Sequence, residues 1–185
     1  MEEGLALQQS IGDPLLINRA RIGLMQVLVS LGELDTVEPM AAEALAVARA
    51  TGDPRSEHFA HHFLADCPLI RGDCAAAAPR YRRALELAVE LADRSETAVE
   101  IQGMAMAAAG NGRPAFALRL AGAADSEFAA LAIDLSGIVF WTALLTRYLG
   151  DARAELGPAA AAAAWDEGRR TRFEDAIALA LGEAV

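Results

Sequence analysis

Hydrophobic side chains recur at steps of three and four along most of the chain, which is typical of α-helices with one buried face. Leu24, Leu28 and Leu31 share one such face, and Tyr81 and Leu85 belong to another. Glycines interrupt these segments, and each Gly-Asp-Pro combines a helix stop with a proline suited to the first turn of the next helix. The pattern predicts helices at 2–11, 15–31, 35–51, 55–71, 73–93, 95–110, 113–132, 137–156, 158–167 and 173–183.

These breaks recur every 40 residues. Gly12-Asp13-Pro14 is followed by Gly52-Asp53-Pro54 and, more weakly, by Ala92-Asp93-Arg94, while Gly32, Gly72 and Gly112 lie half a period out of phase. Helix pairs at a fixed period bury their apolar faces by stacking on one another. We therefore predict an all-α fold, an α-α superhelix built as one domain over residues 1–185. The expected parts are repeats at 15–54, 55–94 and 95–134, an orphan helix of a preceding repeat at 1–12, and capping helices at 135–185.

Composition and charge exclude several classes of protein. Hydrophobic residues make up 54% and charged residues 23% of the 185, which argues against disorder. The net charge is −10, and all 16 basic residues are arginines, so we expect no direct contact with nucleic acid. The longest apolar run, at 135–146, is far shorter than the ~20 residues that span a bilayer. With no signal peptide at the N-terminus, we expect a cytoplasmic protein that does not enter membranes.

The second half of each repeat resembles a tetratricopeptide repeat. In that family a glycine ends the first helix, and small residues flank an aromatic residue in the second. The middle repeat carries this pattern as Gly72, Ala77, Tyr81 and Ala84. The other two repeats keep the small positions but lack the aromatic residue: Gly112, Ala117, Ala121, Ala124 and Gly32, Val37, Ala41, Ala44. The period of 40 exceeds the ~34 residues of the common form, which indicates longer helices.

Three stretches near the C-terminus resemble the end of large bacterial signal-transduction ATPases and LuxR-type transcriptional regulators. They are residues 117–124, 164–169 and 173–181. The chain has no lysine, and hence no phosphate-binding loop ending in Lys-Ser/Thr, and it has no basic recognition helix. The resemblance therefore implies a sensor or interaction region of such a regulator, without its ATPase or DNA-binding activity.

One cluster of residues could carry chemistry. His58, His62 and Asp66 are four apart and share one helix face, with His61 and Cys67 beside them. Two histidines at this spacing can chelate a transition metal, but the neighbouring glutamate and third ligand of a zincin-type site are missing. We predict no metal, no cofactor and no catalytic residues. A metal-dependent enzyme using His58, His61 and His62 is the third and weakest hypothesis.

The leading hypothesis is a non-enzymatic protein-interaction or sensor module whose partner binds in the concave groove of the superhelix. That partner is a protein or peptide, including the rest of a larger regulator. The alternative on the same fold is a receptor for a small-molecule effector. The predicted groove residues are Ile22, Gln26, Phe59, His62, Asp66, Gln102 and Met106. Helix 2–11 lacks a preceding partner, so we expect either a homodimer through this N-terminal helix or a longer array.

Overall fold

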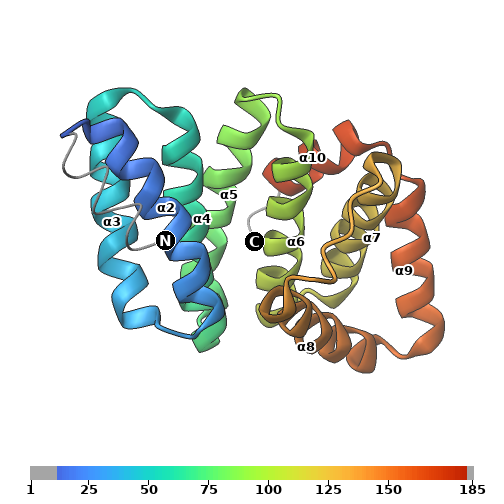
Figure 1. Ribbon diagram of the computed structural model, residues 1–185. Helices are drawn as coiled ribbons and strands as arrows, with labels where there is room; N and C mark the ends of the chain where they lie inside the picture. Colours follow the sequence, from blue (N-terminus) through green and yellow to red (C-terminus); the bar gives the residue numbers. More distant parts are fainter. Residues whose placement is uncertain (1–11, 183–185) are drawn as a thin grey trace.

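The computed structural model describes residues 12–182, and in this range all regular structure is α-helical (Figure 1). The helices are α2 (Pro14–Ser30), α3 (Leu34–Thr51), α4 (Pro54–Arg71), α5 (Cys74–Glu90), α6 (Arg94–Gly110), α7 (Pro114–Leu131), α8 (Val139–Leu156), α9 (Pro158–Arg170) and α10 (Phe173–Gly182). The predicted all-α fold is confirmed, and these helices begin and end close to the expected residues. The predicted helix 2–11, with the homodimer assigned to it, lies outside the described residues.

From α2 to α7 the helices pack consecutively, each against the next, as the repeat period predicted. In addition α2 contacts α4, α4 contacts α6, and α6 contacts α8. These four helices therefore form one continuous row, which we call the first-helix face. Figure 1 shows α2–α4 at one end of the molecule and α6–α10 at the other, with α5 between them. Among the described helices, none combines the length and the apolarity needed to cross a bilayer.

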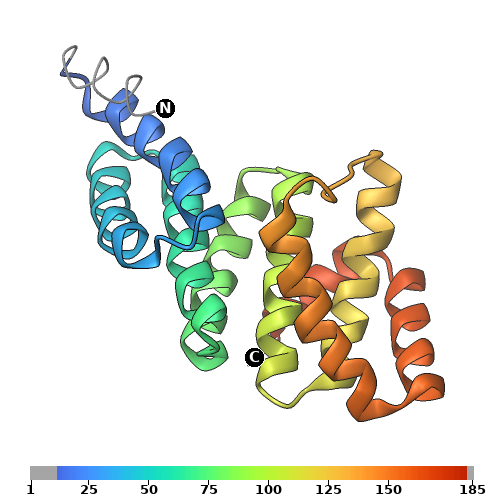
Figure 2. The ribbon, with the colours of Figure 1, turned by 60° about the horizontal axis from the view of Figure 1, so that its bottom comes forward.

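The C-terminal helices depart from this regular stacking. The helix α9 packs along α7, while α8 lies against α6 and α7, as Figure 2 shows in orange and red. The last helix, α10, returns to contact α5, α6 and α7, and Arg82 of α5 donates a hydrogen bond to the backbone carbonyl of Leu181. The helices that follow α7 thus fold back on α5, α6 and α7, and the capping role of residues 135–185 stays a prediction.

The apolar core forms two clusters of buried side chains. One lies among α2, α3 and α4 and includes Met25 and Phe63, and the other extends from α4 to α10 around Tyr81 and Met104. Phe140, in the first turn of α8, packs against both clusters. Alanines fill many of the closest helix contacts because they bury no bulky side chain.

The 40-residue period is visible in the backbone conformation. Among the residues with positive φ, Gly12, Gly52, Ala92 and Ala132 follow one another at this spacing, with φ of 77°, 64°, 53° and 54°. At the helix starts that follow three of these positions, the side chains of Asp13, Asp53 and Asp93 accept hydrogen bonds from backbone N–H groups of the first turn. Three boundaries between repeats therefore carry a residue in the left-handed conformation, followed by an aspartate that caps the next helix. At two of the four left-handed positions an alanine stands where glycine is favoured.

Two other glycines allow α7 and α9 to approach each other closely. A side chain added at Gly122 would collide with the backbone carbonyl of Trp165, and one added at Gly168 would collide with that of Arg119. By contrast, Gly150 of α8 has nothing within 4 Å of the place where a Cβ atom would lie. The packing of α9 on α7 therefore depends on the absence of two Cβ atoms.

Replacing Ala92 by glycine should stabilise the protein. A residue with a Cβ loses about 1 kcal/mol in the left-handed region, and glycine does not, so we expect the free energy of unfolding to rise by about 0.5–1 kcal/mol in urea titrations. Ala163→Gly is the control, because this exposed alanine lies inside α9. There glycine should cost about 1 kcal/mol. If Ala92→Gly destabilises the chain as much as Ala163→Gly does, the left-handed conformation is not a source of strain.

Gly168→Ala should lower the free energy of unfolding by about 1–3 kcal/mol, because the added methyl group separates α9 from α7. Gly150→Ala is the matched control within a helix. Since it meets no neighbour, it should leave the stability unchanged or raise it by up to about 1 kcal/mol. Equal unfolding midpoints for the two variants would contradict the close approach of α7 and α9.

Candidate functional site

A pocket of about 150 Å3 opens on the first-helix face, where α2, α4, α6 and the start of α8 come together. Its lining combines aromatic and aliphatic side chains with a few polar groups. The lining residues are Gln26 of α2, Phe59 and His62 of α4, Glu96 and Val99 of α6, Leu135 and Ile138 of the loop before α8, and Phe140 and Trp141 of α8. This concave, mixed surface built from four helices is the best candidate for a binding site.

The structure brings three of the predicted groove residues to this pocket: Gln26, Phe59 and His62. Gln102 lies behind it, where its side-chain oxygen accepts a hydrogen bond of 2.8 Å from Nε1 of Trp141. Ile22 is half-buried against the N-terminal core cluster. Asp66 and Met106 are fully buried and offer no surface to a partner. The predicted groove therefore includes two residues that belong to the core, and Trp141 of α8 contacts a third, Gln102.

The six remaining lining residues were not predicted from the sequence. Glu96 and Val99 are on the predicted helix 95–110, but projecting the repeats selected Gln102 and Met106 instead. Leu135, Ile138, Phe140 and Trp141 lie in the apolar run 135–146, which has no equivalent in the earlier repeats. An uncharged run that carries two aromatic residues beside a loop was the available signal for this part of the site.

Behind the pocket, a buried polar network connects α4, α5 and α6. Glu100 is fully buried, and its Oε1 accepts hydrogen bonds from Nε2 of His58 at 2.9 Å and from Nδ1 of His62 at 2.8 Å. The other ring nitrogen of His62 lies 3.4 Å from Oδ2 of Asp66. The hydroxyl of Tyr81 donates to Oδ1 of Asp66 at 2.5 Å. Helical spacing explains the network, since 58, 62 and 66 share the face of α4 that meets α6.

Aromatic packing fixes the position of His62. Its ring lies 5.6 Å from that of Trp141 and 6.0 Å from that of Tyr81, measured between ring centroids. Gly103 makes room for Tyr81, because a Cβ at this position of α6 would lie 2.5 Å from the tyrosine ring. His62 is therefore held by aromatic side chains from α5 and α8 and by carboxylates from α4 and α6.

The opposite charges of His62 and Glu100 stabilise each other. Burial alone lowers the pKa of His62, but the carboxylates of Asp66 and Glu100 outweigh it and raise the pKa to about 10. Burial raises the pKa of Glu100, yet His62 and His58 outweigh it and lower that pKa to about 2. At neutral pH the two side chains therefore form a buried ion pair. Burial also raises the pKa of Asp66, and it raises that of Glu96 at the pocket edge.

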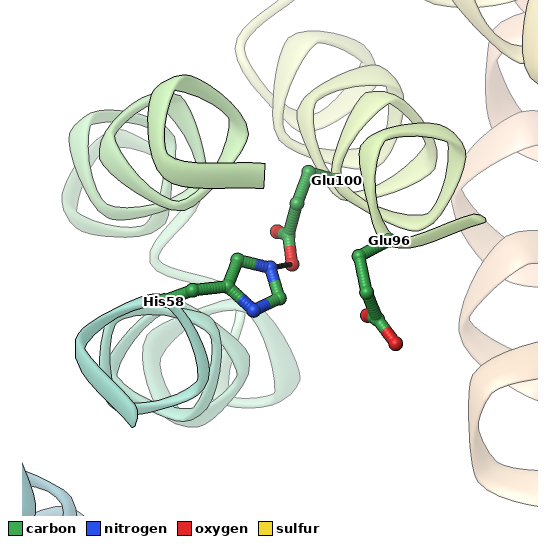
Figure 3. A group of neighbouring side chains, drawn as sticks. All are labelled: His58, Glu96 and Glu100. Carbon is green, nitrogen blue, oxygen red and sulfur yellow. Dashed lines mark hydrogen bonds and ion pairs between the residues drawn. The ribbon is translucent and has the colours of Figure 1, made fainter. Parts of the chain in front are cut away.

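The third histidine does not join this network. Nε2 of His61 lies 3.4 Å from a guanidinium nitrogen of Arg49 and 3.8 Å from Oε1 of Glu57. Burial, together with the charges of Arg80 and Arg49, lowers the pKa of His61 to about 4. The ligand atoms that gather around His58 come instead from Glu96 and Glu100 of α6, and one atom from each of the three residues lies within 4.8 Å of the others (Figure 3).

The two cysteines lie away from the pocket. Cys67 and Cys74 are both buried free thiols. Burial and the nearby Asp66 carboxylate raise the pKa of Cys67 to about 12. A thiol that stays protonated is a poor nucleophile, so Cys67 behaves as a small apolar residue.

The His62–Glu100 pair predicts a specific pH dependence of stability. The folded-state pKa of His62, about 10, lies above its ordinary value of 6.5. Its contribution is therefore fully present below pH 6.5 and is lost as the pH rises toward 10. We expect the free energy of unfolding to fall between pH 6.5 and 8.5, by up to about 1.4 kcal/mol per pH unit.

Urea titrations across this range test the expectation with two variants. His62→Gln should remove most of the decline, whereas His61→Gln should retain it, because the lowered pKa of His61 confines its titration to more acidic pH. A wild-type stability that is constant or rising from pH 6.5 to 8.5 contradicts a protonated His62.

No protein-family model, no curated protein and no solved structure matches the chain. The function of this arrangement of helices and side chains must therefore be inferred from its own chemistry.

Proposed function

We propose that this chain is a non-enzymatic protein-interaction module of a cytoplasmic bacterial signalling regulator, and that its partner inserts a side chain into the pocket on the first-helix face. The stretches that resemble the C-terminal region of signal-transduction ATPases and LuxR-type regulators support the biological setting. The single observation that carries the binding role is the pocket itself, where aromatic side chains from α4 and α8 surround a small hollow.

The pocket has an apolar rim. Ile138 is 37% exposed and Val139 is 74% exposed, in the loop and first turn that lead into α8. Exposed aliphatic residues beside aromatic ones are typical of protein-binding surfaces, where a few buried aromatic contacts carry most of the binding energy. Phe59, Phe140 and Trp141 supply the aromatic part of this surface.

The size of the pocket favours a protein or peptide over a free effector. Sites for drug-sized small molecules enclose roughly 300–1,000 Å3. The volume of about 150 Å3 in this chain suits one inserted side chain, with the rest of the partner lying on the apolar rim. The small volume therefore favours the protein-interaction hypothesis over the small-effector receptor.

The charge of the chain constrains the partner. With a net charge of −10, the module attracts a basic surface and repels an acidic one, which increases the association rate with basic partners at low salt. We therefore propose a partner whose binding segment carries arginine or lysine beside an apolar anchor residue.

Peptides selected from a displayed random library against the purified chain would test the proposal. Trp141 lines the pocket, so in a Trp165→Phe background its fluorescence reports occupation directly. We expect selected peptides to be basic and to shift this fluorescence. Ile138→Glu should weaken their binding at least tenfold, because it places a carboxylate on the apolar rim.

Val89→Glu provides the matched control, since Val89 on α5 is 39% exposed and does not line the pocket. It should leave peptide affinity within twofold of the wild type. Peptides that bind Ile138→Glu as tightly as the wild-type chain would refute the pocket. A thermal-shift screen in which small metabolites, and no peptides, stabilise the chain would favour the effector receptor instead.

A further inference from the structure

Three potential metal ligands meet where α4 packs against α6. Figure 3 shows His58 reaching from α4 toward Glu100 of α6, with Glu96 one turn earlier on the same helix. One ligand atom from each residue lies within 4.8 Å of the others, and Nε2 of His58 is 2.9 Å from Oε1 of Glu100. Ligands bound at 2.0–2.2 Å around one ion lie about 3 Å apart, so this pair already has a suitable separation.

One buried carboxylate oxygen of the cluster accepts no hydrogen bond from the described residues and is available to bind a metal ion. Glu100 is fully buried, yet its Oε2 has no hydrogen-bond partner in the part of the chain that is described. A buried carboxylate oxygen without a partner is costly, and such atoms in a native protein call for an ion or a water that the protein atoms do not supply.

The charges of the cluster also favour a cation. The carboxylates of Asp66, Glu96 and Glu100 lie around only two imidazole rings, those of His58 and His62. Burial of an excess of negative charge is unfavourable unless it is paired. A divalent ion bound to the neutral ring of His58 and to the two glutamates would balance the remaining carboxylates.

We propose that His58, Glu96 and Glu100 form a binding site for one divalent transition-metal ion at the floor of the pocket. One imidazole and two carboxylates suit Zn²⁺ and Mn²⁺, whereas Mg²⁺ and Ca²⁺ prefer oxygen ligands alone. On binding, the ion takes the place of the proton on Nε2 of His58, and the neutral ring then carries its proton on Nδ1. His62 keeps its hydrogen bond to Glu100 and so orients that ligand from the outer shell.

The site has an open side. Glu96 is half-buried and lines the pocket, whereas His58 and Glu100 are buried behind it. Three protein ligands leave at least one coordination position of a tetrahedral ion free, and here that position is on the side of the pocket, where water completes the shell. This ligand set differs from the three histidines of the sequence-based hypothesis, because two glutamates of another helix take the places of His61 and His62. The metal site does not depend on the proposed peptide binding.

Isothermal titration of Zn²⁺ and Mn²⁺ into the EDTA-treated, tag-free chain tests the site. We expect one ion per chain and a rise in Tm with either ion. Glu96→Gln should reduce the affinity at least tenfold, as loss of a ligand does, while circular dichroism stays unchanged because Glu96 is only half-buried. Glu57→Gln is the control. This substitution removes an acidic residue of α4 that lies beside His61 and outside the proposed site. The variant should bind both ions as the wild type does.

Several results would overturn the metal site. They are the absence of stoichiometric binding in the wild-type chain, equal affinities of Glu96→Gln and wild type, and Mg²⁺ binding as tight as that of Zn²⁺. The last result would exclude His58 as a ligand. The titrations contain no peptide, so a failure of the metal site is distinguished from a failure of the pocket to bind one.

Discussion

The burial of Glu100 is the constraint on which the centre of this molecule depends. A carboxylate with no exposed surface must be matched by donors, and α4 supplies two of them from successive turns, His58 and His62. Because removing one partner of a buried charged pair costs far more than the pair contributes, α4 and α6 have little freedom to shift relative to each other. Tyr81 and Trp141 pack around His62, so α5 and α8 are positioned by the same group.

Most of the fold was predictable from the sequence because its signals are local. Glycine stops, aspartate caps and apolar steps of three and four each act within one turn of helix, and they recur with the 40-residue period. The left-handed backbone of Ala92 and Ala132 shows how strongly this period is maintained. Both alanines adopt the conformation of the glycines at equivalent positions, since the surrounding helices determine it.

The candidate site was less predictable, because it depends on contacts between residues far apart in the chain. Helical spacing correctly places His58, His62 and Asp66 on one face, but it does not say that Glu100 lies opposite them. Nor does a repeat projection place the loop before α8 over the first-helix face, since this loop has no counterpart in the repeats. Asp66 and Met106 were assigned to the groove surface, although both are fully buried.

The position of α8 has a consequence for how the chain unfolds. In a regular array each repeat contacts only its neighbours, so segments can unfold one after another from the ends. Here Phe140 packs into the N-terminal cluster, and the hydroxyl of Tyr148 donates to the carbonyl of Leu69, 79 residues earlier. These long-range contacts link the stability of the first helices to that of the last ones. The described helices therefore combine the local architecture of an array with the long-range contacts of a globular domain, and we expect the cluster of α2, α3 and α4 to loosen when α8 detaches.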